Sequence, residues 1–231
     1  MLNIKDIFMS KKSFNFCDVI GYGWGVMCSN LWFFVGLGLV YIILLYLPSI
    51  AGIAVDYIEM PEPLYMILGI SLQVIYYVVN AVLTIGMIKI GLSFCDERKP
   101  KISTLFDAFD CFWRYIGVAI VYSLIVIGGL LLFIVPGIIW SIKYSLCYYF
   151  VVDKGLGPIE AIKASGRATD GVKWDLFGFN IFACMIVYAG LLCFIVGILA
   201  TYPIALIGYA LVYRQLAAQS TEQVETAALV D

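Results

Sequence analysis

The sequence predicts an all-α polytopic membrane protein: a helical bundle of about six transmembrane helices, arranged as three parallel hairpin repeats with amphipathic helices at the membrane surface. Of the 231 residues, 63% are hydrophobic and only 13% are charged, whereas soluble domains are about half apolar and a quarter charged. The apolar residues gather in runs long enough to cross a membrane, which takes about 20 residues. The basic residues fall in alternate connecting segments, as the positive-inside rule requires.

The first hairpin is expected at about residues 31–94. Its first span runs from Leu31 to about Val55, and the acidic residues and prolines of 56–63 end it. The second span runs from Leu64 to about Phe94. Residues 1–30 are expected to form a cytoplasmic or interfacial N-terminal segment.

The second hairpin is expected at about 113–152. The apolar run is too long for one helix, and Pro136-Gly137 predicts the turn inside it, because both residues break helices. Gly128-Gly129 is a competing turn. The fourth span then continues to about Val152.

The third hairpin is expected at about 174–216, with a turn between Gly197 and Pro203. Apart from Pro203, no residue indicates a helix broken within the membrane. The polar segment 217–231 is expected to be a disordered cytoplasmic tail.

The basic residues predict the orientation. Thirteen of the 14 lysines and arginines fall on one side of this arrangement, and the other side carries only acidic residues. The 13 are Lys5, Lys11, Lys12, Lys89, Arg98, Lys99, Lys101, Arg114, Lys154, Lys163, Arg167, Lys173 and Arg214. Both ends are therefore predicted to be cytoplasmic, and the chain is predicted to be a multi-pass protein of the cytoplasmic (inner) membrane.

Residues 113–135 align without gaps on residues 174–196, with identity at eleven of 23 positions. Trp113 and Trp174 are in register, as are two pairs of glycines, and Trp32 opens the first hairpin in the same way. Tryptophan favours the headgroup region, so Trp32, Trp113 and Trp174 are predicted to anchor the three hairpins at the membrane surface. The glycines are predicted to allow close helix packing.

A short amphipathic helix is predicted before each hairpin, at Phe14–Ile20, Thr104–Trp113 and Pro158–Thr169. In the second, Thr104 and Asp107 have the spacing of a capping box. These helices are expected to lie along the inner leaflet, and the alternative is that they are ordinary cytoplasmic connections.

Several motifs of the second half resemble a known family. They are Ile134-Val135-Pro136-Gly137-Ile138-Ile139, Glu160-Ala161-Ile162-Lys163-x-Ser165 and Gly171-x-Lys173-Trp174-x-Leu176-Phe177. Together they resemble the prokaryotic six-span membrane family related to the membrane domain of glycerophosphoryl diester phosphodiesterases, including its uncharacterised stand-alone members. The resemblance covers roughly residues 105–215, and the N-terminal third matches in hydropathy alone.

In those phosphodiesterases a separate soluble domain, rich in histidine and carboxylates, carries out catalysis. These 231 residues contain neither such a segment nor any histidine. The resemblance therefore implies the fold but not hydrolysis.

Lys143 is the charged residue that lies deepest in a predicted span, about 15 Å from Asp153 at 1.5 Å per residue. An intramembrane charge indicates a functional site, and the alternative is that the lysine stem extends to the membrane surface. Gln73, Asn80 and Thr84 in the second span form a polar stripe with Tyr76 and Tyr77. The stripe either faces a cavity, which with Lys143 gives a candidate intramembrane polar site, or forms hydrogen bonds between helices.

Gly137, Ser141 and Ser145 have the spacing of small residues that pack two helices together. Gly21-x-Gly23-x-Gly25 follows no strand, so it does not predict a nucleotide site. Without histidine or a cysteine pair, the sequence predicts no metal, no cofactor and no catalytic residue. The small net charge of -2 predicts no nucleic-acid partner.

Two functions remain open. The first is a non-enzymatic membrane module that binds membrane lipids, a protein partner or a second copy of the chain. The second is a transporter of a small solute or lipid-like molecule that uses the polar site around Lys143. A hydrated cavity that reaches Lys143 and Asn80 favours transport, and a dry bundle favours the module.

Overall fold

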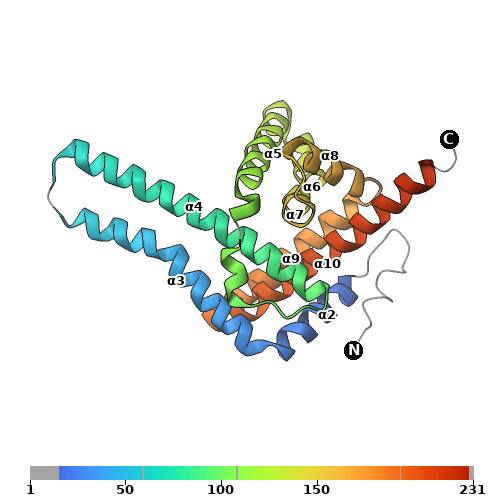
Figure 1. Ribbon diagram of the computed structural model, residues 1–231, viewed down its shortest axis with the longest axis horizontal. Coiled ribbons are helices and arrows are strands. Elements are labelled where there is room, and N and C mark those ends of the chain that lie inside the picture. Colours follow the sequence, from blue (N-terminus) through green and yellow to red (C-terminus); the bar gives the residue numbers. More distant parts are fainter. Residues whose placement is uncertain (1–15, 59, 108, 193, 229–231) are drawn as a thin grey trace.

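The computed structural model describes residues 16–228 apart from Glu59, Ala108 and Cys193, and every regular element in that part of the chain is a helix (Figure 1). The predicted all-α class is confirmed. The helices of the predicted spans are α3 (Leu31–Asp56), α4 (Glu62–Cys95), α5 (Phe112–Leu132), α6 (Ile134–Lys143), α7 (Cys147–Lys154), α9 (Lys173–Leu192) and α10 (Phe194–Ala228). The other elements are α2 (Phe16–Ser29), η1 (Ile102–Phe106), η2 (Phe109–Cys111) and α8 (Pro158–Ala168).

Five stretches of the described chain are long and apolar enough to cross a membrane: α3, α4, η1 through α5, α6 with α7, and α9. Large apolar side chains stand exposed along them; Ile43, Ile67 and Leu131 expose 62%, 65% and 83% of their surface. Soluble proteins rarely leave apolar patches of this extent uncovered. These helices indicate a membrane protein. Helix α10, which contains the sixth predicted span at 198–216, is not among the five.

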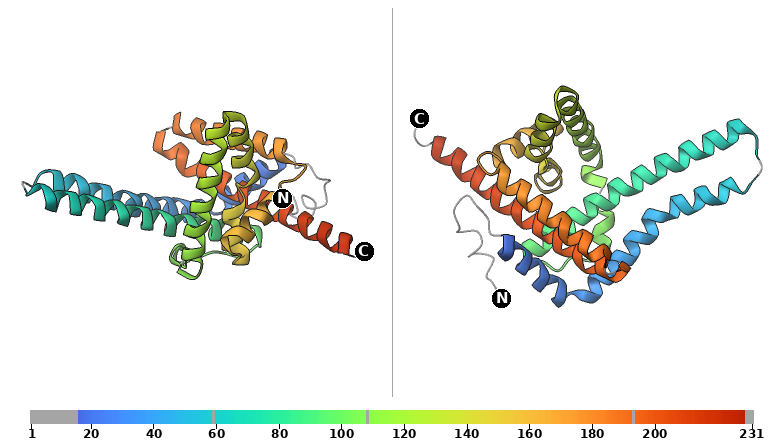
Figure 2. Two further views of the ribbon diagram at one scale, coloured as in Figure 1. Left: turned by 90° about the horizontal axis from the view of Figure 1, so that it is seen from above. Right: turned by 180° about the vertical axis from the view of Figure 1, so that it is seen from behind.

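The long helices form three hairpins that meet at one end and diverge at the other. We call the connection between the two helices of a hairpin its tip. The α3–α4 hairpin projects farthest from the centre, and the tips of the α5–α6 and α9–α10 hairpins point in two other directions (Figures 1 and 2). In α4 every buried residue lies between Leu83 and Cys95, in the half that reaches the centre. We call this common end the base. Leu105, Val118 and Ile207, fully buried from three different elements, belong to its core.

The two aligned segments of the sequence form corresponding helices. Helix α5 begins at Phe112 and α9 at Lys173, each one residue before its aligned tryptophan. Near the tip, a Cβ on Gly129 would lie 2.9 Å from the Cα of Gly137 in the returning helix. In the third hairpin, a Cβ on Gly190 would lie 2.8 Å from the Gly197 carbonyl oxygen. In each of these hairpins, a glycine of one helix therefore lies against a glycine of the other, and close helix packing uses such pairs of small residues.

The turn between the third and fourth predicted spans is not at Pro136-Gly137. Helix α5 ends at Leu132, and Phe133, with φ −163° and ψ 153°, is the extended residue before α6. Pro136 then lies in the first turn of α6, where a missing N–H costs nothing because those groups have no acceptor within the helix. The competing turn, Gly128-Gly129, lies inside α5.

The fourth predicted span is also not continuous. Helix α6 ends at Lys143 and α7 starts at Cys147, so residues 144–146 interrupt it. The expectation that Pro203 marks the one disturbed span is therefore wrong. Pro203 itself lies inside α10.

Two surface segments, Thr104–Trp113 and the C-terminal tail, differ from their predictions. In place of a regular helix over Thr104–Trp113 there are the 3-10 turns η1 and η2, and Asp107 ends η1 instead of completing a capping box. Part of the tail expected to be disordered continues α10 to Ala228, since no glycine or proline follows Gly208 to stop the helix. Helix α2 starts at Phe16, and the first residues of the predicted Phe14–Ile20 helix lie outside the described chain. Helix α8 forms as predicted.

Adjacent glycines of α5 offer a matched test of the hairpin packing. We expect Gly129→Ala to lower the melting temperature of the detergent-solubilised protein, because the new methyl group meets the α6 backbone; overpacking costs about 1–3 kcal/mol. Gly128 has no atom within 4 Å of its Cβ position, so Gly128→Ala should leave the melting temperature unchanged or slightly higher. Equal effects of both changes would contradict this packing.

Candidate functional site

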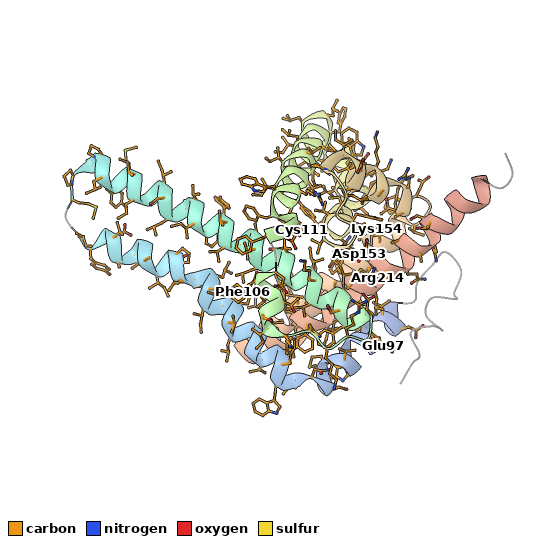
Figure 3. The ribbon with its side chains drawn as sticks, in the orientation of Figure 1. Glu97, Phe106, Cys111, Asp153, Lys154 and Arg214 are labelled. Carbon is orange, nitrogen blue, oxygen red and sulfur yellow. The ribbon has the colours of Figure 1, made fainter. Side chains whose placement is uncertain are left out.

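Arg214, inside α10, joins that helix to the C-terminal ends of α4 and α7 at the base. Its Nη1 donates a hydrogen bond to Asp153 Oδ2 near the end of α7 at 2.9 Å, and its Nη2 donates one to Asp96 Oδ2 just after α4 at 2.7 Å. Asp153 Oδ2 also accepts a hydrogen bond from the Tyr213 hydroxyl at 2.7 Å. Figure 3 shows Asp153 and Arg214 close together where α7 and α10 meet. We call Arg214, Asp96 and Asp153 the base triad.

Electrostatics explain why the base triad needs its arginine. Asp96 caps the C-terminus of α4, and Asp153 lies in the last turn of α7. A helix C-terminus carries partial negative charge, so a carboxylate there is unfavourable and a cation favourable. One guanidinium therefore compensates two carboxylates and two helix ends, through charge-assisted hydrogen bonds that are stronger than neutral ones.

Helix α2 packs at the base against the end of α4 and against α10. The Tyr22 hydroxyl donates a hydrogen bond to the Phe94 carbonyl oxygen at 3.3 Å, and burial raises the pKa of Tyr22 to about 12. A Cβ on Gly23 would lie 3.0 Å from the Ile204 carbonyl oxygen of α10. The Gly21-x-Gly23-x-Gly25 motif therefore lies in a helix, and its central glycine packs against another helix.

A cavity of about 670 Å³ lies between α4, α5, α7, α9 and α10, next to the break in the fourth predicted span. Six tyrosines line it, and none of its lining residues is Lys, Arg, Asp or Glu. The tyrosines are Tyr115, Tyr148, Tyr149, Tyr188, Tyr202 and Tyr209. We call this space the tyrosine-lined cavity.

Hydroxyl groups are the principal polar groups of the tyrosine-lined cavity. The Tyr209 hydroxyl donates to the Asn180 side-chain oxygen, while the Thr84 hydroxyl donates to the Asn80 carbonyl oxygen at 2.8 Å. The rings of Tyr115 and Tyr148 lie 5.2 Å apart. An apolar wall with a few hydrogen-bonding groups and no charge fits an uncharged, mainly apolar molecule.

The four residues of the predicted intramembrane polar site do not share a cavity. Gln73 lines a separate cavity of about 690 Å³ between α3 and α4, on the projecting hairpin. Thr84 lines the tyrosine-lined cavity, and Asn80 lies one turn away and contacts it through the Thr84 hydroxyl. Lys143 lines a third pocket, against α8. The polar stripe thus divides between two spaces, and Lys143 belongs to neither.

Lys143 is not isolated in the middle of a continuous span. It ends α6, and its carbonyl oxygen accepts hydrogen bonds from the hydroxyls of Ser165 and Thr169 in and after α8, at 3.1 and 2.9 Å. The depth of 15 Å assumed an unbroken helix to Asp153, whereas the break at 144–146 brings Lys143 beside α8. Sequence spacing could not predict this, because the partners of the break lie more than 20 residues away.

The other predicted residues are placed as follows. Trp32, Trp113 and Trp174 expose 85%, 79% and 77% of their surface near the base, as side chains facing lipid headgroups would. Gly137 packs on Gly129 of α5, and the Ser141 carbonyl oxygen accepts a hydrogen bond from Tyr122 of α5 at 3.1 Å. Ser145 lies in the break and lines the tyrosine-lined cavity.

Comparison with known proteins gives remote relatives. The chain is 28% identical over 137 residues to uncharacterised proteins of Mycobacterium bovis and of two strains of Mycobacterium tuberculosis. The match covers 57% of this chain and 40% of each relative, so the chain spans less than half the length of the curated relatives it matches. No family model and no solved structure matches the chain significantly. The resemblance of residues 105–215 to the membrane family named above stays a prediction.

The residues that sequence reasoning missed are those of the base triad and most of the tyrosines. Asp96, Asp153 and Arg214 each mark the end of a predicted span, and their shared position at span ends on one side was the available signal. Among the described residues, no cluster of three or more metal-binding side chains is found.

A double-mutant cycle tests the base triad. We expect Arg214→Met and Asp153→Asn to show a coupling free energy of about 1–2 kcal/mol in unfolding from detergent, as neighbours in one partly buried network do. The Lys173–Asp170 pair (3.1 Å, with Asp170 75% exposed) is the control. Its coupling should stay below about 0.5 kcal/mol, because exposed pairs are screened by solvent. Equal coupling in both cycles would show that Arg214 does not hold the base.

Proposed function

We propose that this chain is a six-span protein of the cytoplasmic membrane, with both ends in the cytoplasm, that holds an uncharged lipid-like molecule in the tyrosine-lined cavity without catalysing a reaction. The observation that carries the proposal is the cavity itself. Its volume of about 670 Å³ lies within the range of roughly 300–1,000 Å³ typical of ligand sites. Its wall offers hydroxyl groups but no charged side chain.

Charge distribution supports the orientation. The exposed basic segment at Arg98 and Lys99 lies just after α4, at the base, whereas Asp56 and Glu62 lie at the tip of the α3–α4 hairpin. A basic base and an acidic tip match a base on the cytoplasmic side. Helix α10 supplies the sixth span in this proposal, because residues 198–216 pack along α9 and α4.

Transport of the bound molecule is the second candidate. The observation in its favour is the break at residues 144–146, because many transporters bind substrate where a spanning helix is interrupted. Flux of a labelled lipid across proteoliposomes separates the two functions. A holding module retains the lipid without moving it between leaflets, and a transporter moves it at a rate that depends on the protein.

Filling the tyrosine-lined cavity tests the binding proposal. Ala205 lines the cavity from α10, so Ala205→Phe should reduce the amount of uncharged lipid that remains bound during native mass spectrometry by about tenfold, which corresponds to about 1.4 kcal/mol. Ala51 is exposed on α3, and Ala51→Phe is the matched control that should retain wild-type binding. Equal retention in both variants, or no bound uncharged lipid in the wild type, would refute the proposal.

Reporter fusions test the topology. We expect green fluorescent protein fused after Asp231 to fluoresce and alkaline phosphatase fused there to be inactive, because a six-span chain returns its C-terminus to the cytoplasm. Alkaline phosphatase inserted after Met60, between α3 and α4, should be active. The opposite pattern at the C-terminus would indicate an odd number of spans.

A further inference from the structure

The pocket that Lys143 lines is separate from the tyrosine-lined cavity and lies where the end of α6 meets α8. It has a volume of about 470 Å³ and is lined by Lys143, Tyr144, Ile162, Lys163, Gly166, Arg167 and Asp170. Three of its seven lining residues are cations and one is a carboxylate. We call it the α8 basic pocket.

The cations come from two elements that are fixed against each other. The buried face of α8 includes Ala161, Ala164 and Ser165. Lys163 and Arg167 follow at helical spacing on its exposed face, with Gly166 between them. On the other side of the pocket, the Ser165 and Thr169 hydroxyls hold the Lys143 carbonyl oxygen. The backbone positions of the three cations are therefore set by packing.

Gly166 allows Lys143 to lie against α8. A Cβ at position 166 would lie 3.4 Å from Lys143 Cε and 3.2 Å from Tyr144 Cε1. The Lys143 ammonium lies 5.5 Å from the centroid of the Tyr144 ring, within the range of a cation–π contact. These contacts place the Lys143 ammonium group beside the Tyr144 ring at the edge of the pocket.

The charge of the α8 basic pocket is not balanced by the ion pairs of the described chain. None of the ion pairs found among the described residues involves Lys143, Lys163 or Arg167. Asp170, the one acid of the lining, forms an ion pair with Lys173 at 3.1 Å, which adds a fourth cation beside it. Three cations around one concave surface are the arrangement that binds phosphate, since Arg and Lys both donate to phosphate oxygens.

We propose that the α8 basic pocket binds the phosphate of an anionic phospholipid headgroup through Lys143, Lys163 and Arg167. Trp174 stands one residue beyond Lys173 and is 77% exposed, so it puts this part of the base at headgroup level. Basic pockets on the cytoplasmic side bind anionic headgroups in this way. The inference rests on the membrane orientation proposed above but not on the tyrosine-lined cavity.

The experiment compares lipid retention by three proteins in mixed nanodiscs of phosphatidylglycerol and phosphatidylcholine. They are the wild type, the pocket variant Lys143→Gln/Lys163→Gln/Arg167→Gln, and the control variant Arg98→Gln/Lys99→Gln/Lys101→Gln, which removes three exposed charges from the loop after α4. Each cation near an anionic membrane contributes roughly fivefold to binding, and this general attraction falls equally in both variants. We therefore expect phosphatidylglycerol retained in native mass spectrometry to fall about tenfold further in the pocket variant than in the control variant.

Two further arms identify the source of the phosphate and separate this proposal from the previous one. Inorganic phosphate at millimolar concentration should neither displace the retained phosphatidylglycerol nor raise the melting temperature of the wild type. The pocket variant should keep its uncharged lipid in the tyrosine-lined cavity. Loss of uncharged lipid from that cavity and loss of phosphatidylglycerol from the α8 basic pocket are therefore independent results. Equal retention by the pocket and control variants, or full displacement by inorganic phosphate, would overturn the proposal of a lipid headgroup site.

Discussion

The hydrogen bonds of Arg214 to Asp96 and Asp153 are the interaction on which the rest of the structure depends. Each hairpin is stabilised along its own length by local packing, but the three diverge (Figure 1), so their mutual arrangement is decided at the base. Asp96 follows the C-terminus of α4, and Asp153 lies in the last turn of α7. The partial negative charge of each helix C-terminus repels the carboxylate beside it. The Arg214 guanidinium relieves both unfavourable contacts at once, and in doing so brings α4, α7 and α10 to one point.

The arrangement of the helices at the base determines which space lies between their membrane-embedded parts. With α4, α7 and α10 held together and α9 packed along α10, these helices and α5 border the tyrosine-lined cavity. The break at residues 144–146 belongs to the same arrangement, because α8 supplies the hydroxyl groups that satisfy the Lys143 carbonyl oxygen. An interrupted helix is tolerated at membrane depth when its freed backbone groups find partners. The cavity is lined by Ser145 and Leu146 and the pocket on α8 by Lys143 and Tyr144, so both adjoin the same break.

Local patterns predicted the helices well and their relations poorly. The aligned tryptophans located the starts of α5 and α9 to within a residue, since interfacial anchoring acts over neighbouring turns, whereas both helices end three or four residues before the aligned segments do. Pro136 misplaced a turn because proline fits the first turn of a helix as well as a break. In the base triad, Arg214 lies 61 positions from Asp153 and 118 positions from Asp96 along the chain, and no local pattern predicts that these residues pair. The sequence singles out Lys143 as the deepest charge of a predicted span, but its neighbours on α8 depend on a break that spacing alone does not predict.

The most direct test of this account is an electron cryo-microscopy map of the protein in native-lipid nanodiscs. The account predicts continuous density from Arg214 to both Asp96 and Asp153, with an elongated lipid density inside the space bounded by Tyr115, Tyr149 and Tyr209. A map in which Arg214 contacts neither carboxylate, and in which side chains fill that space, would contradict it.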